Sequence, residues 1–397
     1  MDRLVYMDNN ATTMVAPEVV EEMMPFLTTR YGNPSSIHSF GGEVGIDVEK
    51  ARHRVAEFIG ADNDYEIVFT GTGTESDNMA LLGSLAYYRD KRHIITSRVE
   101  HPAILSLCKK LERDGYRITY VPVDREGILD MDYFMDAVDD DTAVVSIMYA
   151  NNETGVINPV SEIGAFLRDR GIPFHVDAVQ AAGKIPIDVN SIHCDLLTLS
   201  GHKFHGPKGV GVLYVRRGTR IRPVLIGGHQ ERGRRPGTEN VPGIVGIGRA
   251  AELAGTHVDY YGTGVKKMRD MLEKGILEKF SNAHLNGSPG NRVPNTTNIG
   301  FDYIEGESIL LYLNEKGIAA SSGSACSSGS LEPSHVLRAM GVPFTSAHGS
   351  IRFSLSRFIT EDDISYVLSV LPGVVERLLE LSPYWDNINR TGKPVNI

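Results

Sequence analysis

Strand-like and helix-like segments alternate along the first half of the chain, and this alternation restricts the possible folds most strongly. Short apolar runs with β-branched residues predict strands, and apolar residues at helical spacing predict the helices between them. The predicted strands are 66–70, 93–97, 117–121, 142–149, 173–177, 196–200 and 210–215. The predicted helices between them are 74–88, 102–113, 131–138 and 159–170. Strands joined through helices form parallel sheets covered on both faces, so we predict a doubly wound α/β fold.

The alternation ends near Gly255, where longer and differently ordered elements begin. The later elements are a helical segment 260–280, strands 297–301 and 350–355, and helices 307–316 and 361–379, the last kinked or broken near Pro372. A chain of 397 residues exceeds a typical single domain. We therefore predict a large domain over 14–255 and a smaller domain formed by 1–13 and 256–397.

Polar residues follow five of the predicted strands near the point where each strand ends. These residues are Thr74, His101, Asn152, Asp177 and Lys203. The carboxyl ends of parallel strands share one edge of the sheet, where α/β proteins bind ligands. In pyridoxal phosphate enzymes a lysine holds the cofactor as a Schiff base, and a carboxylate keeps the pyridine nitrogen protonated. An Asp and a Lys alone are more typical of surface charges, but five polar residues on one edge favour a site.

The segment Gly71-Thr72-Gly73-Thr74 lies between a predicted strand and a predicted helix. Glycines let the backbone approach an anion, and the helix N-terminus supplies N–H groups for it. Thr74 and Asp77 also match a capping box, so a plain capped turn explains the pattern as well as a cofactor phosphate does. The lysine of a P-loop is missing, which disfavours a nucleoside triphosphate.

Composition disfavours several other classes of protein. The formal net charge of −10 argues against a general nucleic-acid binder. Three cysteines provide no disulfide framework, and we find neither a signal-peptide pattern nor an apolar run of about 18 residues, so we expect a soluble cytoplasmic protein with no membrane partner. A metal site is disfavoured because His202 and His205, three residues apart around Lys203, make a poor coordination set. The sequence also contains no Cys-x-x-Cys or His-Glu-x-x-His motif.

Cys326 lies in a run of small residues from 319 to 330. A structural cysteine is normally buried among apolar neighbours, so this composition predicts an accessible thiol on a flexible loop. Such a thiol suits a nucleophile that reaches a substrate and then withdraws, and the alternative is a disordered turn with an incidental cysteine. Cys108 and Cys194 lie within or next to predicted elements and are expected to be packing residues.

Taken together, the motifs resemble those of the NifS/IscS-type cysteine desulfurases, in the aminotransferase class V group, over nearly the whole chain. The matching motifs are Asp8-Asn9-Asn10-Ala11-Thr12-Thr13, Gly73-Thr74-Glu75-Ser76, Glu100-His101-Pro102, Asn151-Asn152-Glu153, Asp177-Ala178-Val179-Gln180, Ser200-Gly201-His202-Lys203, Arg235-Pro236-Gly237-Thr238-Glu239-Asn240 and Ser350-Ile351-Arg352-Phe353-Ser354. The short loop bearing Cys326 and the segment 381–385 are nearer to nitrogenase-associated NifS than to selenocysteine lyases. The resemblance implies a fold type I pyridoxal phosphate enzyme, with a mostly parallel seven-stranded sheet in the large domain and the Cys326 loop in an α+β small domain.

The resemblance also implies a role for each matching residue. Lys203 would hold pyridoxal 5'-phosphate as a Schiff base, Asp177 would pair with its pyridine nitrogen, and His101 would stack on the ring and take part in catalysis. The remaining cofactor-binding residues would be Gly73, Thr74, Asn152, Gln180, Ser200, His202 and, from the other subunit of a homodimer, Thr238. Asn152 and Arg352 would clamp the substrate carboxylate.

The implied reaction converts L-cysteine into L-alanine and a persulfide on Cys326. Lys203 would remove the Cα proton, and the Cys326 thiolate would attack the substrate sulfur. An iron–sulfur scaffold protein of the NifU/IscU type would accept the sulfur for iron–sulfur cluster assembly, with Cys326 contacting the scaffold-bound cluster during transfer. Two alternatives stay open: an aminotransferase or selenocysteine lyase on the same fold, and a non-catalytic binding scaffold. The complete set of Lys203, Asp177 and Cys326 favours an enzyme.

Overall fold

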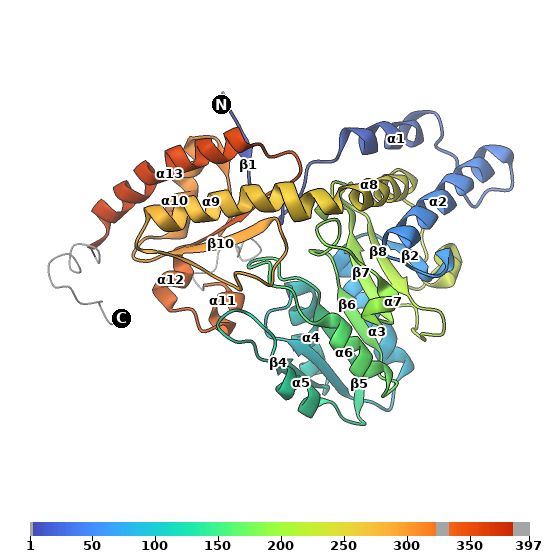
Figure 1. Ribbon diagram of the computed structural model, residues 1–397. Coiled ribbons are helices and arrows are strands. Elements are labelled where there is room, and N and C mark those ends of the chain that lie inside the picture. The colour runs from blue at the N-terminus through green and yellow to red at the C-terminus, as the bar shows by residue number, and fades with distance from the viewer. Residues whose placement is uncertain (1–2, 323–332, 384–397) are drawn as a thin grey trace.

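The computed structural model describes residues 3–322 and 333–383. Figure 1 shows a large α/β unit beside a smaller unit, which contains α9, α10, α13 and β10. Strand β1 (Val5–Tyr6) lies in the smaller unit, where it pairs with β11 (Ile318–Ala319) from much later in the chain.

Seven strands form the central sheet of the large unit, in the order β2-β8-β7-β6-β5-β3-β4. Their bounds are β2 Ile67–Thr70, β3 His93–Ser97, β4 Arg117–Val121, β5 Thr142–Met148, β6 Phe174–Asp177, β7 Leu196–Ser200 and β8 Gly211–Val215. β8 runs antiparallel to both of its neighbours, and the other adjacent pairs are parallel. The predicted mostly parallel, seven-stranded sheet is confirmed.

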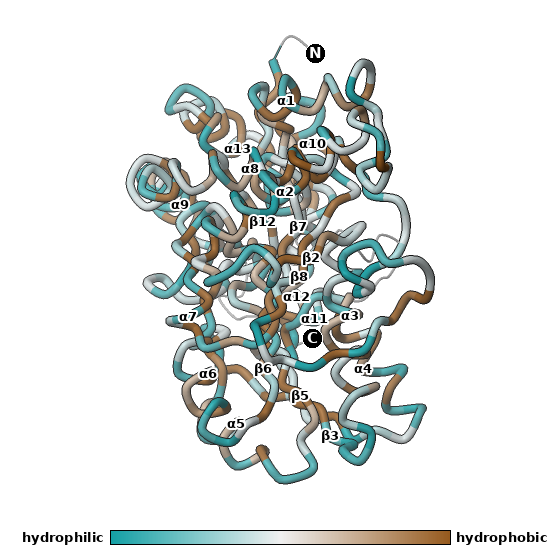
Figure 2. The backbone as a smooth tube through the Cα atoms, turned by 90° about the vertical axis from the view of Figure 1, so that its right-hand side faces the viewer, coloured by the Kyte–Doolittle hydropathy of each residue, from teal (hydrophilic) through white to brown (hydrophobic). Residues whose placement is uncertain are grey.

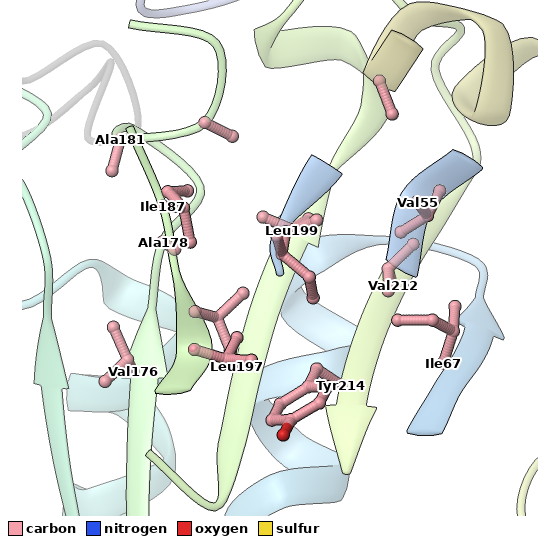
Figure 3. Close-up of a cluster of buried hydrophobic side chains, with 14 of the residues drawn as sticks. Val55, Ile67, Val176, Ala178, Ala181, Ile187, Leu197, Leu199, Val212 and Tyr214 are labelled. Carbon is pink, nitrogen blue, oxygen red and sulfur yellow. The ribbon is translucent and has the colours of Figure 1, made fainter. Parts of the chain in front are cut away.

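Helices cover both faces of this sheet. They are α1 Pro17–Thr28, α2 Ser39–Phe58, α3 Gly73–Tyr87, α4 Pro102–Arg113, α5 Met131–Ala137, α6 Val160–Arg168, α7 Val189–Ile192 and α8 Val241–Tyr260. Side chains alternate along a strand, so Val144 is buried in a cluster with α3 and α4, and Val145 in a cluster with α2, α6 and α8. Figure 3 shows part of the second cluster, where Val55 of α2 lies beside Val212. With both faces covered, the strand ends are left for a ligand.

The smaller unit is built on an antiparallel sheet with β10 between β9 and β12. Its elements are β1 Val5–Tyr6, α9 Lys266–Lys279, β9 Ala283–Leu285, β10 Thr296–Phe301, α10 Gly306–Glu315, β11 Ile318–Ala319, α11 His335–Ala339, α12 Phe344–His348, β12 Ser350–Ser354 and α13 Glu361–Leu381. β1 pairs in parallel with β11, which ties the N-terminal segment to this unit. Figure 2 shows hydrophobic segments along the strands and hydrophilic ones in many outer loops.

The predicted boundary near Gly255 falls inside a continuous helical run, because α8 passes through a π-helical turn at Tyr261–Val265 into α9. The burial pattern changes along this run. Ala254 belongs to the hydrophobic cluster of the large unit, and Tyr261 to that of the smaller one. The two-domain division stays a prediction, and the separate clusters support it.

Two local predictions differ from the structure. The predicted break near Pro372 is wrong, since α13 continues through this proline as one element, while the alternative kink stays a prediction. The cap of α3 is Thr72 instead of Thr74: the Thr72 hydroxyl accepts a hydrogen bond from the Glu75 N–H at 3.1 Å. In residues 3–322 and 333–383 no helix combines the length and apolar character needed to cross a membrane.

Candidate active site

A pocket of about 600 Å³ opens at the carboxyl ends of the parallel strands, between the two units. Ten of the predicted site residues line it: Gly73, Thr74, His101, Asn152, Asp177, Gln180, Ser200, His202, Lys203 and Arg352. Arg352 comes from β12 of the smaller unit, and the others come from the large unit. The predicted convergence of the strand ends is therefore present in the structure.

Two predicted residues are not in this group. Thr238 lines a separate pocket of about 200 Å³ together with Arg235 and Glu239, so within one chain it does not reach the larger pocket. Cys326 lies outside the described residues.

Lys203 ends a short 3₁₀ turn directly after β7. Its Nζ donates hydrogen bonds to the main-chain oxygens of Asn10, at 2.7 Å, and Ala11, at 2.8 Å. Asn10 is itself held by a bond from its side-chain nitrogen to the Thr296 hydroxyl, at 2.9 Å. The N-terminal loop thus brings two acceptors to the lysine amine at the pocket wall. Sequence reasoning missed these contacts because a polar loop without periodicity does not indicate its partners.

Asp177 ends β6 and is buried, with Oδ1 accepting from the Val179 N–H at 2.9 Å. Burial raises the pKa of Asp177 to about 6, opposed by the Val179 N–H and the positive charge of Lys203. A second carboxyl, Asp77 of α3, lines the same pocket and was expected only as a cap residue. Burial and the charge of Asp177 hold the pKa of Asp77 well above its ordinary value.

His101 caps α4, and its Nδ1 accepts a hydrogen bond from the Ala103 N–H at 3.1 Å. Burial, together with the nearby charges of Lys203 and His335, lowers the pKa of His101 to about 4. The imidazole is therefore neutral at pH 7. Since Nδ1 acts as an acceptor, the network assigns the ring proton to Nε2.

The opposite end of the pocket is suited to an anion. Thr74 lies in the first turn of α3, a helix of 15 residues whose N-terminus faces the pocket. Gly73 permits close approach there, because an added Cβ would lie 3.2 Å from Val179 Cγ2 and 3.3 Å from Ser200 Cβ. Lys208, a residue that sequence reasoning missed, also lines the pocket and adds positive charge.

Arg352 is a buried guanidinium on the pocket wall. Nη2 donates to Asp8 Oδ1 at 2.7 Å, and Nη1 donates to the Asn152 main-chain oxygen at 2.9 Å. Its Nε is buried without a hydrogen-bond partner among the described residues. A planar guanidinium matches the geometry of a carboxylate or a phosphate, which can each accept two parallel hydrogen bonds from it.

Comparison with known proteins matches residues 5–367 to the aminotransferase class-V family. This chain belongs to that family. The cysteine desulfurase of Trichormus azollae is 59% identical over 384 residues, covering 96% of this chain and 95% of the relative. Cysteine desulfurase NifS of Azotobacter vinelandii is 55% identical over 381 residues, covering 96% of this chain and 95% of the relative. A solved structure titled NifS-like protein has a TM-score of 0.89 at 40% identity, covering 95% of this chain and all of the other.

These relatives confirm the family and the fold class predicted from the sequence motifs. The class-V aminotransferase family is pyridoxal phosphate-dependent, and the residues that line the pocket fit that cofactor. Two observations fit it. Asp77 Oδ1 has no hydrogen-bond partner in the described part of the chain, and lies 3.6 Å from His175 Nε2. Asp77 and Asp177 together line the pocket with two buried carboxyl groups, which suit a protonated ring nitrogen. The Gly73 cradle at the α3 N-terminus suits the phosphate.

Proposed function

We propose that this class-V aminotransferase family member is a cysteine desulfurase that takes sulfur from L-cysteine through pyridoxal 5'-phosphate and Cys326. The observation that carries the proposal is the single pocket in which Lys203, Asp177 and Arg352 meet. A lysine, a buried carboxylate and a buried guanidinium supply the three functions that the reaction needs: a base, a ring partner and a carboxylate anchor. Relatives at 55–59% identity over nearly the whole chain support the same activity.

The pocket residues divide into those for the ring and those for the phosphate. Lys203 would hold the cofactor covalently, Asp177 would pair with the pyridine nitrogen, and neutral His101 would lie against the ring face. Gln180 would bond the ring oxygen. Residues for the phosphate would be Gly73, Thr74, Ser200 and His202, with Thr238 contributed by the other subunit. When bound, the cofactor withdraws electrons from the substrate Cα.

The chain's own residues then supply binding and proton transfer. Arg352 and Asn152 would orient the L-cysteine carboxylate, and Lys203, held at the wall by main-chain oxygens, would take the Cα proton. The Cys326 thiolate would form an S–S bond to the substrate sulfur as the Cβ–S bond breaks. The electron pair of the Cβ–S bond would pass to Cβ, which takes a proton. Lys203 would return the proton that it took to Cα, and L-alanine would leave.

A homodimer would complete the phosphate site through Thr238. Large apolar side chains that one chain leaves open to solvent support an interface: Ile37 is 106% exposed, Ile226 89% and Tyr31 71%. The persulfide on Cys326 would then pass to an iron–sulfur scaffold protein of the NifU/IscU type, and the enzyme would act in the cytoplasm.

The test combines an absorption spectrum with product assays. Purified protein should show a visible cofactor band that changes on adding L-cysteine, and with a reductant it should release alanine and sulfide in equal amounts. Cys326→Ala should keep the spectral response and lose sulfide release, while Cys108→Ala, a buried control, should keep both. Alanine formation at the wild-type rate by Cys326→Ala would refute the nucleophile assignment, and absence of the band would refute the cofactor.

A second experiment tests the shared site. Sedimentation should give twice the chain mass of 43.5 kDa. Mixed dimers of Lys203→Ala and Thr238→Ala subunits should contain one site with both defects and one intact site, and so recover cofactor binding at one site per dimer. Retention of full cofactor affinity by Thr238→Ala dimers would contradict the cross-subunit role.

A further inference from the structure

Lys184 is a buried lysine that the proposed reaction does not use. Lys184 is 3% exposed and lies in a series of tight turns after β6. Burial holds the pKa of Lys184 well below its ordinary value, and the charges of Lys203 and Arg352 lower it further. Burying an amine is costly unless it is hydrogen-bonded. This cost indicates that the position has a specific task.

The fold of the segment directs Lys184 back toward Gln180. Gly183, directly before the lysine, has a φ of 71° and lies so close to its neighbours that an added Cβ would approach Phe204 Cβ to 3.0 Å. The Lys184 Nζ donates to Gln180 Oε1 at 2.5 Å. A turn that only glycine adopts readily therefore brings the amine to the amide four residues earlier.

The orientation of the Gln180 amide follows from its two partners. Gln180 Nε2 lies 2.9 Å from the main-chain oxygen of Asn10. A main-chain oxygen only accepts, so the atom facing Asn10 is the amide nitrogen. The amide oxygen then faces Lys184, which donates to it in either charge state. The same Asn10 oxygen accepts from Lys203 at 2.7 Å, so the arrangement is continuous with the proposed catalytic lysine.

We propose that Lys184 is a positioning residue that locks the Gln180 side chain so that an N–H, and not the oxygen, faces the pocket. Gln180 lines the pocket, and with its oxygen and one N–H engaged, the second N–H is the group left for a ligand. The ligand atom beside it must be an acceptor, such as an ionised phenolic oxygen. The inference rests on the proposed function, in which that oxygen belongs to pyridoxal phosphate.

The test is a double-mutant cycle on the holoenzyme, read out by cofactor release and by the pH midpoint of the visible band. Lys184→Met keeps the length of the side chain and removes its donor, so the Gln180 amide can turn. We expect cofactor release to be at least about 5-fold faster, which corresponds to the loss of one hydrogen bond. We also expect the pH midpoint of the visible band to shift. Lys91→Met is the control, since it removes a lysine that donates one hydrogen bond away from the pocket, to the main-chain oxygen of Thr142 at 3.2 Å.

The second arm uses Gln180→Leu, which removes the group that Lys184 is proposed to orient. In this background Lys184→Met should cause no further change in release or midpoint, because coupled residues are not additive. The double variant should also melt at a higher temperature than Gln180→Leu alone, since that single change leaves a buried amine without its acceptor. This stability comparison holds even if Lys184→Met by itself does not fold.

Full additivity of the two changes, or no effect of Lys184→Met on release and midpoint, would overturn the positioning role. Wild-type protein that fails to take up pyridoxal phosphate at all would instead refute the proposed function. The two failures are therefore distinguishable in one set of measurements.

Discussion

Replacing Arg52 with methionine should destabilise the protein strongly, because it breaks a buried ion pair and leaves one charge behind. Arg52 of α2 donates from Nη1 and Nη2 to the two carboxylate oxygens of Glu231, at 2.7 and 2.8 Å. Its Nη1 also donates to the main-chain oxygen of Ile67 at 2.9 Å. Both side chains of the pair are 4% exposed.

The expected magnitude follows from what remains after the change. Glu231 would keep a single buried donor, the Phe69 N–H at 3.0 Å. Removing one partner of a buried ion pair costs about 3–5 kcal/mol of the free energy of unfolding, and we expect the lower end because the charges of Arg232, Arg234 and Arg235 still act on Glu231. Glu231 and Arg232 also adopt left-handed backbone, with φ of 48° and 59°, which the fold must hold in place. The same loop continues to Thr238, which we propose contacts the cofactor phosphate of the other subunit, so cofactor retention should fall as well.

The assay is urea unfolding at matched protein concentration, with cofactor release measured in parallel. The control is Arg377→Met, which removes an exposed pair with Glu380, 60% and 68% exposed, and should cost about 0–1 kcal/mol. Adding Glu231→Gln to Arg52→Met should recover part of the loss, because the amide oxygen can still accept from Phe69 without a buried charge. A loss under about 1 kcal/mol for Arg52→Met, equal to the control, would refute the reasoning.

Three further predictions concern the pocket and its surroundings. Burial raises the pKa of Glu100 from 4.5 to about 8, so the folded state holds a proton that the unfolded chain releases. The contribution of Glu100 to stability is therefore fully present below about pH 4.5 and falls by about 5 kcal/mol as the pH rises to about 8. Glu100→Gln should remove this part of the pH dependence, measured by urea unfolding at pH 5 and 8. Gly73→Ala should weaken cofactor binding about tenfold, or about 1.4 kcal/mol, because the added methyl group is crowded by Val179 and Ser200. Gly42→Ala is the control, since Gly42 on α2 faces open space. Equal cofactor affinities of the two variants in equilibrium dialysis would contradict this prediction. Arg352→Lys should raise KM for L-cysteine about 10–100-fold, since a point charge replaces a two-pronged donor, and an unchanged KM in steady-state assays would exclude the carboxylate role.

Much of the fold was predictable because its signals are local. The segment Thr142–Met148 is an apolar run bounded by polar residues, and burial on both faces of a parallel sheet selects for such runs. Asp177 ends a strand, and His101 and Lys203 follow strands, so the geometry of parallel sheets alone places them on one edge. The break of α13 at Pro372 was predicted wrongly, because packing against α9 and α10 outweighs a local preference.

The sequence by itself determined the type and order of the elements, the edge where the site lies, and the family through its motifs. The tertiary structure decided which groups meet there. Lys203 bonds to Asn10 across 193 positions and Arg352 to Asp8 across 344, and no periodicity encodes contacts at such separations. Burial is likewise a property of the packed chain, so the raised pKa of Asp177 and the lowered pKa of Lys184 arise only in the folded protein.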